Sequence, residues 1–379
     1  MNNSEKYFKE FINKQIDEIS FVDLKKDAKI RIGEKEYTAN SEFPIPIREK
    51  NLLKDIKNQD NYDGVSIKNI IDGIIYIYGT DSKFKYSDKY DDILEALGID
   101  VESFIIYNIN SFDDSMLNES LVYANALINK IQSAKTCFIY ANVLEKSYYH
   151  IQDKAAENTE EAIIVFNEMI KYYEKAIDYD EAFNLAYYKL GYIYKQCGQY
   201  IRAKLYWEKQ QKLDDDSIRV DEIRKNLEDM EVLVEFETGK NLILEGHAEA
   251  GIEKLLPLVE NFSSWWDLLF FVGLGYRQIE SYEVALRYFE NALMIRNEDK
   301  LTLNEIGLCR LNLERYEEAR DVFTNLLSLD PNNCEILCNR AVAKYHLYDD
   351  EGARNDVRLA LKIDEEDEVA NNLSEFLNQ

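Results

Sequence analysis

The residues best suited to chemistry in this sequence are three histidines, five cysteines and a few pairs of adjacent acids. Histidine is the usual general base, a cysteine thiolate is a nucleophile or a metal ligand, and neighbouring carboxylates can divide acid and base roles. They are His150, His247 and His346; Cys137, Cys197, Cys309, Cys334 and Cys338; and the pairs Asp113-Asp114, Asp214-Asp215 and Glu365-Glu366. Because they are scattered along the chain, we predict no catalytic residue, no metal site and no cofactor.

The short motifs of common enzymes are also missing. The chain has no GxSxG, no HExxH and no GxxxxGK[ST]. Cys334 and Cys338 are four residues apart and would share a helix face, but a metal site needs two further ligands. Packed thiols are the simpler interpretation. A carboxylate-based active site within residues 1–115 remains open as an alternative.

Composition indicates a folded, largely helical and acidic protein. The 379 residues are 46% hydrophobic, and no proline occurs between Pro46 and Pro257. A long stretch without proline favours helices. The formal net charge is −27, which would repel a phosphate backbone, so we predict no nucleic-acid partner. The charge is explained by a solvated surface, with attraction to a basic partner as the alternative.

Nothing in the sequence predicts export or membrane insertion. The opening MNNSEKYFKEF is charged where a signal peptide needs an apolar core. The longest apolar runs, IIDGIIYIY and WWDLLFFVGLGY, each contain an Asp and are shorter than a membrane-spanning helix. An odd number of cysteines suits a reducing compartment. We therefore expect a cytoplasmic protein.

One pattern of small and large residues recurs along the chain. The stretch YYKLGYIYKQCGQYIRA (187–203) reappears as FVGLGYRQIESYEVALRYFENALMI (271–295), and the last copies follow at a period of 34 residues. A small residue inside the helical pattern is followed twelve positions later by an alanine: Gly191, Gly273, Gly307 and Ala341, then Ala203, Ala285, Ala319 and Ala353. Glycine in a helix costs about 1 kcal/mol relative to alanine. We expect the small residue and the alanine to meet where two helices pack closely.

This period and pattern resemble the tetratricopeptide repeat, whose unit is a pair of antiparallel helices. Pro331 stands where that motif ends. The resemblance implies a mainly α fold, a right-handed superhelix of helical hairpins. It predicts repeats over about 184–217, 232–265, 266–299, 300–333 and 334–367, irregular helix pairs over 117–183, and a capping helix over 368–379.

The repeat over 232–265 is degenerate. Gly239 and Gly251 occupy its two small positions, and Pro257 falls in its second helix, where we expect it to kink or shorten the helix. Fourteen extra residues separate Gly191 from Gly239 beyond one period, and the segment 217–232 has near-helical apolar spacing. We expect it to lengthen a helix.

Residues 1–115 have a different pattern, which predicts a small N-terminal α+β domain ahead of a solenoid over 116–379. An amphipathic helix is expected over 4–19, a short hairpin around Gly33 with an extended segment after it over 28–47, and helices over 66–79 and 89–98. The stretch VESFIIYNI (101–109) suits either a strand or a helix. No family is recognised for this part.

Tetratricopeptide arrays bind proteins or peptides, and the resemblance places the binding residues on the concave face, on the first helix of each repeat. In this sequence the matching positions are Tyr188, Tyr192, Lys195, Phe270, Leu274, Arg277, Leu301, Asn304, Leu308, Asn312, Cys338, Asn339 and Val342. They are mostly apolar and aromatic, unlike the basic residues with which some members clamp a C-terminal carboxylate. We therefore expect a non-enzymatic scaffold or adaptor that binds a partner with apolar anchors, while the asparagines hydrogen-bond the partner's backbone.

Two alternatives stay open. The same positions could be core, packed between neighbouring repeats or covered by a segment of the chain itself. The length and repeats are also similar to peptide-pheromone-sensing regulators of Gram-positive bacteria, which carry an N-terminal helix-turn-helix or three-helix bundle. The strand pattern at 28–47 departs from that arrangement. The oligomeric state is not predicted.

Overall fold

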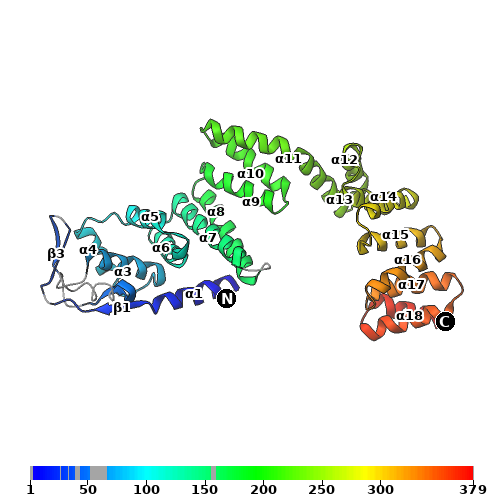
Figure 1. The fold of residues 1–379 in the computed structure, drawn as a ribbon, viewed down its shortest axis with the longest axis horizontal. Helices are drawn as coiled ribbons and strands as arrows, with labels where there is room; N and C mark the ends of the chain where they lie inside the picture. Colours follow the sequence, from blue (N-terminus) through cyan, green and yellow to red (C-terminus); the bar gives the residue numbers. More distant parts are fainter. Residues whose placement is uncertain are drawn as a thin grey trace. The chain divides into compact units, whose positions relative to one another are not determined.

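The structure, a computed structural model, describes residues 3–25, 27–32, 34–38, 43–51, 66–154 and 159–378. It divides into two compact units, one comprising Met1–Gln196 with Leu205–Val220 and the other Cys197–Lys204 with Asp221–Gln379. Helices dominate both units (Figure 1). Residues 1–115 belong to the same unit as the helix pairs that follow them, and a domain boundary at 115 remains a prediction.

The N-terminal part combines short strands with helices, as the sequence predicts. Its elements are α1 Asn3–Ile16, β1 Ile19–Val22, β2 Lys29–Ile32, β3 Lys35–Thr38, β4 Ile45–Arg48, α3 Ile67–Thr80, α4 Ser87–Ala96, α5 Val101–Ser111, η1 Asp114–Met116 and α6 Leu117–Lys130. The hairpin expected near Gly33 is the antiparallel pair β2–β3; Gly33 itself lies outside the described residues. The ambiguous stretch over 101–109 is helical.

The expected helix over 4–19 is shorter than predicted. It ends at Ile16, and Ile19 begins β1, which pairs antiparallel with β4 so that Ile19 lies opposite Arg48. Arg48 is only 2% exposed. Its Nη2 donates to Glu18 at 3.0 Å and to Glu119 at 3.2 Å, and its guanidinium lies 4.0 Å from the centre of the Tyr76 ring. This charge is therefore balanced within the fold.

The rest of the chain is a succession of helices, most of them packed as antiparallel pairs (Figure 1). They are α7 Ala134–Lys154, α8 Glu160–Tyr179, α9 Asn184–Gln196, α10 Tyr200–Leu213, α11 Ser217–Leu244, α12 Ala248–Asn261, α13 Trp266–Gln278, α14 Tyr282–Ile295, α15 Lys300–Asn312, α16 Tyr316–Leu329, α17 Cys334–His346, α18 Asp350–Ile363 and α19 Glu368–Leu377. We call the first helix of a repeat its A helix and the second its B helix. The predicted hairpins over 266–367 and the terminal helix are confirmed.

A polar residue recurs at the start of the A helices. Asp299, Asn333 and Asp367 are spaced by one repeat, and each accepts a hydrogen bond from the backbone N–H three residues ahead. This bond satisfies one of the donors that a helix leaves unpaired at its N-terminus. The caps therefore fix where α15, α17 and the terminal helix α19 begin.

The small residue of each A helix meets a different side chain from the one expected. A Cβ added to Gly191 would lie 2.2 Å from the Trp207 ring, and one added to Gly273 would lie 2.8 Å from the Phe289 ring. These rings belong to residues four positions beyond the repeat alanine, one helical turn further along the B helix. The glycine therefore makes room for a ring of the B helix. The alanines Ala203, Ala285, Ala319 and Ala353 are fully buried.

The degenerate repeat keeps the same contact between a glycine of the first helix and a large residue of the second, but the large residue is a leucine instead of an aromatic ring. Here a Cβ on Gly239 would approach Leu255 to 2.5 Å. The segment before it lengthens a helix, as predicted, since α11 has 28 residues. Pro257 does not shorten its helix: α12 has 14 residues, as α14, α16 and α18 do. Leu255 is fully buried and Pro257 is exposed, so the proline ring lies on the solvent side.

Candidate functional site

The A helices of the second unit present side chains of graded exposure at the predicted binding positions. On α13, Phe270 and Leu274 are half-buried and pack against the cores between neighbouring helices. Phe270 stacks on Trp266 with ring centres 5.1 Å apart. Leu301, at the start of α15, is 64% exposed. Leu308 is half-buried against the next hairpin. Part of this apolar set is thus core, and Leu301 is its most accessible member.

Cys338 does not belong to an accessible surface. It is 1% exposed and lies in the core cluster shared by α15, α16 and α17. Burial raises the pKa of its thiol to about 11, so the thiol stays protonated near neutral pH. The prediction of Cys338 as a binding residue is therefore wrong, because its position on α17 faces the neighbouring hairpin. Val342, one turn further on, is half-buried.

Two asparagines predicted to bind a backbone each have an unused polar atom. On α15, Asn304 donates through Nδ2 to Glu335 Oε1 at 3.2 Å, but its Oδ1 is buried without a hydrogen-bond partner. On α17, Asn339 Nδ2 is buried without a partner too. Buried polar atoms are usually paired because an unpaired one costs about 1–3 kcal/mol. Asn312 is different: it is exposed and donates to Leu308 O at 2.9 Å on its own helix.

The same A helices carry an ion pair that sequence reasoning did not identify in full. Arg277 Nε on α13 lies 2.5 Å from Glu305 Oε2 on α15, and the Glu305 side chain is 15% exposed. Burial raises the pKa of Glu305 above its ordinary value, although Arg277 opposes the rise. Arg277 was predicted and Glu305 was not. Glu305 could have been found from the sequence because it directly follows Asn304, which was predicted as a binding residue.

In the first unit, the three predicted residues of α9 gather around one indole. Tyr192 packs edge-on against Trp207 with ring centres 4.8 Å apart, and Tyr188 packs against Tyr192 at 5.0 Å. Lys195 Nζ lies 5.6 Å from the centre of the Trp207 ring. Tyr188, Tyr192 and Lys195 are all half-buried. They form an aromatic cluster with a cation at its edge.

The histidines and cysteines show no catalytic arrangement in the described part of the chain. His346 stacks on Tyr316 with ring centres 4.3 Å apart, and His247 is exposed before α12. Burial raises the pKa of Cys309 to about 12, which disfavours the thiolate. Among the described residues, no group of three or more His, Cys, Asp or Glu side chains is placed to hold a metal ion. Within the same residues, no helix combines the length and apolarity needed to cross a bilayer.

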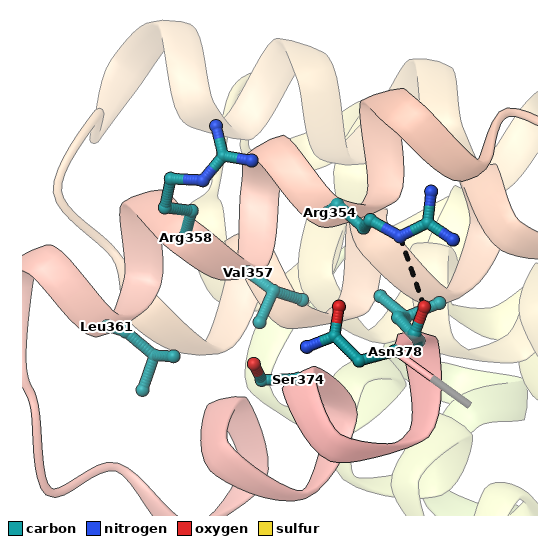
Figure 2. A pocket seen from close by; sticks show the side chains of 7 residues that line it. Arg354, Val357, Arg358, Leu361, Ser374 and Asn378 are labelled. Atoms are coloured by element: carbon teal, nitrogen blue, oxygen red, sulfur yellow. Dashed lines mark hydrogen bonds between the residues drawn. The ribbon is translucent and has the colours of Figure 1, made fainter.

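Hollows also lie outside these positions in the described part of the chain. A cavity of about 130 Å³ lies between α18 and α19, where Arg354, Val357, Leu361 and Leu377 line it (Figure 2). Arg354 Nε donates to Leu377 O at 3.1 Å and so ties α19 to α18. A larger cleft lies in the first unit between α1 and α6–α8. Neither was predicted: the cavity depends on how α19 packs against the last repeat, and the cleft depends on how helices without clear repeat spacing pack together.

Comparison with known proteins supports the repeat assignment. Family models described as tetratricopeptide repeat match residues 185–217 and 301–333. Similar solved structures include the APC/C hetero-tetramer Cut9–Hcn1, at 16% identity over 86% of this chain and 66% of that chain with a TM-score of 0.42.

Two further structures are similar over smaller shares of the chain. YrrB, described as a TPR protein with an unusual peptide-binding site, has 17% identity over 66% of this chain and 97% of its own, with a TM-score of 0.28. A MamA fragment from Desulfovibrio magneticus RS-1 has 16% identity over 39% and 83%, with a TM-score of 0.37. The assignment rests on the two family matches and on the repeated glycine–ring packing.

Proposed function

The chain is a tetratricopeptide repeat protein, and we propose that it is a non-enzymatic scaffold whose A helices α13, α15 and α17 bind a peptide segment of a partner protein. The proposal includes a cytoplasmic location, no cofactor and no nucleic-acid partner. It treats residues 1–115 as a separate α+β domain. It also assigns Tyr188, Tyr192 and Lys195 on α9 a supporting role in binding.

The observation that carries this proposal is the pair of unused amide atoms on neighbouring A helices. Asn304 offers an acceptor, Oδ1, and Asn339 offers a donor, Nδ2. A peptide backbone carries one donor and one acceptor on each residue other than proline. Both asparagine side chains are half-buried, so an extended segment lying across α15 and α17 would satisfy the two atoms after the amide groups turn outward to meet its backbone. Their cost in the free protein would be recovered on binding, which favours a bound state.

Leu301 provides the apolar contact beside these amides. Its side chain is 64% exposed on the first turn of α15, three residues before Asn304. Residues three apart on a helix are neighbours on its surface. Burying an exposed leucine contributes about 1.5–3 kcal/mol. Half-buried Phe270, Leu274, Leu308 and Val342 would extend the apolar contact area, and exposed Asn312 would lie at its edge.

The ion pair between Arg277 and Glu305 explains why a carboxylate clamp is not proposed here. Glu305 already lies 2.5 Å from Arg277. A partner's carboxylate would have to compete with it for the same guanidinium. Specificity would instead come from the apolar anchors, with the asparagines fixing the register of the partner.

The test is a selection followed by a comparison of variants. A random peptide library is selected on the full chain, and the affinity of a selected peptide is measured by calorimetry. The site variant carries Leu301→Ser, Asn304→Ala and Asn339→Ala. The control carries Met294→Ser, since Met294 is 73% exposed on the B helix α14.

We expect the site variant to bind at least tenfold more weakly and the control to bind like the wild type. Thermal unfolding should be little changed in both, because Leu301 and Met294 are exposed and each asparagine has an amide atom without a partner, while the bond from Asn304 Nδ2 to Glu335 is the one hydrogen bond named above that the site variant loses. Equal affinity of a folded site variant would reject this face as the binding site.

A further inference from the structure

The terminal helix α19 occupies the place of an A helix in a further repeat. Asp367 caps it as Asp299 caps α15, two repeat lengths earlier. α19 contacts α17, as α17 contacts α15, and in the described part of the chain no B helix of its own packs against it. The residues of α19 can therefore be compared with those of α15 position by position.

Where following helices would pack, α19 is polar. Leu303 of α15 is buried, whereas Asn371 at the matching position is exposed. Gly307, which lies against the ring of Phe323, is matched by exposed Glu375. Terminal repeats need a polar outer face to remain soluble. At these positions polar residues thus replace those that other A helices bury.

The positions that match the proposed binding face have kept their character instead. Three residues of α19 repeat the residue types and the spacing of α15: Val369, Asn372 and Phe376 in place of Leu301, Asn304 and Leu308. Residues with this spacing lie on one face of a helix. Val369 and Phe376 are 58% and 51% exposed, and Asn372 is exposed too. If solubility alone decided the residue types of α19, this face would be as polar as Asn371 and Glu375 make the other.

The apolar side chains of this face lie on two helices that are not neighbours. Phe376 packs edge-on against Tyr345 of α17 with ring centres 5.1 Å apart, and Tyr345 is itself 38% exposed. On the first turn of α17, however, the position of Leu301 and Val369 is taken by exposed Glu335. The first-turn apolar contacts are therefore offered by α15 and α19, with one A helix between them.

We propose, building on the function proposed above, that the partner segment continues across α17 onto α19 and binds there through a second large apolar side chain. Leu301 contacts one apolar side chain of the partner, and Val369 and Phe376 contact the other. Asn372 hydrogen-bonds the backbone beside the second anchor, as Asn304 does beside the first. α19 is then a part of the binding face as well as the cap of the array.

The spacing of the helices sets the spacing of the anchors. The axes of packed helices lie about 8–10 Å apart, so two steps from α15 to α19 cover about 16–20 Å. An extended chain rises about 3.3 Å per residue, so the two anchors stand about five or six residues apart in the partner. The partner is therefore an extended segment with two large apolar residues at this separation.

The probe is a displayed library of random peptides in which two leucines are the only apolar residues and stand between two and nine positions apart. It is selected on the full-length wild type and on two variants. The α19 variant carries Val369→Ser and Phe376→Ser. The matched control carries Leu359→Ser and Ile363→Ser, which lie on the B helix α18 and are 49% and 45% exposed.

We expect the wild type and the control to enrich peptides whose leucines stand about five or six positions apart, and the α19 variant to enrich no separation. A peptide enriched on the wild type should bind the α19 variant at least tenfold more weakly and the control with unchanged affinity. A folded α19 variant that keeps the wild-type affinity and the same enrichment overturns the proposal.

The variant with Leu301→Ser, Asn304→Ala and Asn339→Ala separates the two proposals. If it loses binding while the α19 variant does not, the face on α15 and α17 stands and its extension to α19 is rejected. If it binds like the wild type, the function proposed above fails and this inference fails with it.

A crosslinking arm decides the question even if the α19 variant does not fold. A photo-crosslinking group replaces each leucine of an enriched peptide in turn, and the products with the wild-type protein are mapped by mass spectrometry. Crosslinks from one leucine position to α15 and from the other to α19 support the proposal. Crosslinks of which none reaches α19 overturn it.

Discussion

The ring of Phe323 occupies the space that a methyl group on Gly307 would need. A Cβ built on Gly307 would lie 2.4 Å from Phe323 Cε1, well inside van der Waals contact. In the last repeat the equivalent residues are Ala341 and Val357, which share one core cluster. The A-helix residue there has gained a methyl group, and the B-helix residue has a smaller side chain in place of the ring. Small and large residues thus compensate at one contact between the paired helices.

This compensation predicts that Gly307→Ala destabilises the protein through overpacking, by about 1–3 kcal/mol. Phe323→Val alone should also destabilise it, since it leaves a cavity beside the glycine. The double variant copies the Ala341–Val357 contact, so we expect its loss to be smaller than the sum of the single losses. Chemical denaturation of the wild type, the two single variants and the double variant gives the coupling free energy between the two positions. Additive losses would show that the two positions do not share the space.

A second contact between A and B helices changes its chemistry from repeat to repeat. Tyr194 stacks on Tyr206 with ring centres 5.3 Å apart, and Tyr276 stacks on Tyr288 at 5.6 Å. At the equivalent positions of the last repeat, Lys344 Nζ lies 2.8 Å from Asp356 Oδ2. An aromatic pair is thus replaced by an ion pair. Arg340 adds two hydrogen bonds, at 2.8 and 2.7 Å, to the same carboxylate.

We expect Asp356→Ala to destabilise the last repeat by about 3–5 kcal/mol. The Asp356 side chain is 3% exposed, and removing it leaves two cations partly buried without their partner. Lys344→Met should cost much less, because Arg340 still pairs with Asp356. Hydrogen exchange of α17 and α18 measures the local effect. If Lys344→Met lowers the stability of the last repeat more than Asp356→Ala does, Asp356 is not the central member of this ion-pair network.

The repeat spacing predicts the hairpins well because it marks the close contact between helices. Gly273 and Gly307 locate their A helices from sequence alone, and the alanines twelve residues later locate the B helices. The ring that fills the space above each glycine was assigned to the wrong neighbour, because a linear pattern does not show which turn of the B helix faces the A helix.

Other features depend on contacts that no local pattern shows. β1 pairs with β4, which lies more than twenty residues away, so the sequence placed Ile19 at the end of a helix and predicted no strand over residues 20–22. Cys338 lies where the exposed and the buried faces of α17 meet. At such a position, a shift of one residue in the sequence decides whether a side chain lies at the surface or in the core. The cleft beside α1 depends on helices outside the regular repeats. Such features require the packed structure.

The turn between the A and B helices contains a strained tyrosine. The seventh residue after each small position has a positive φ: Gly198 at 69°, Gly246 at 87°, Glu280 at 60°, Glu314 at 59° and Tyr348 at 61°. Glycine adopts this conformation freely, whereas other residues pay about 1–2 kcal/mol. Tyr348 is 95% exposed, so its side chain adds little packing energy to offset that strain.

We therefore expect Tyr348→Gly to stabilise the protein by about 0.5–1 kcal/mol, after allowing for the greater freedom of glycine in the unfolded chain. Tyr348→Ala keeps the strained backbone and should change stability little. The midpoint of denaturant unfolding compares the two variants. If Tyr348→Gly is the less stable of the two, Tyr348 makes a contact worth more than the strain.

The turn between α10 and α11 is held by a buried carboxylate, which makes it sensitive to acid. The Asp214 side chain is 1% exposed and accepts from Arg219 Nε at 2.7 Å, from Arg219 Nη2 at 2.8 Å and from Gln210 Nε2 at 2.6 Å. The hydrogen bonds of Arg219 hold the pKa of Asp214 below its ordinary value. Because the folded pKa is lowered, the stabilisation is complete above about pH 4, the unfolded value. It is lost as the pH falls through the folded pKa.

We expect Asp214→Asn to destabilise the protein by about 1–3 kcal/mol at pH 7, since a hydrogen-bonded charge is removed beside Arg219. The difference from the wild type should shrink as the pH falls below 4, because protonation removes the same charge from the wild type. Asp215→Asn is the matched control, since Asp215 is exposed and its removal alters the net charge equally. Stability is measured by urea unfolding between pH 2 and 7. A gap between Asp214→Asn and the control that stays constant across this range would show that the Asp214 carboxylate does not stabilise the turn through its charge.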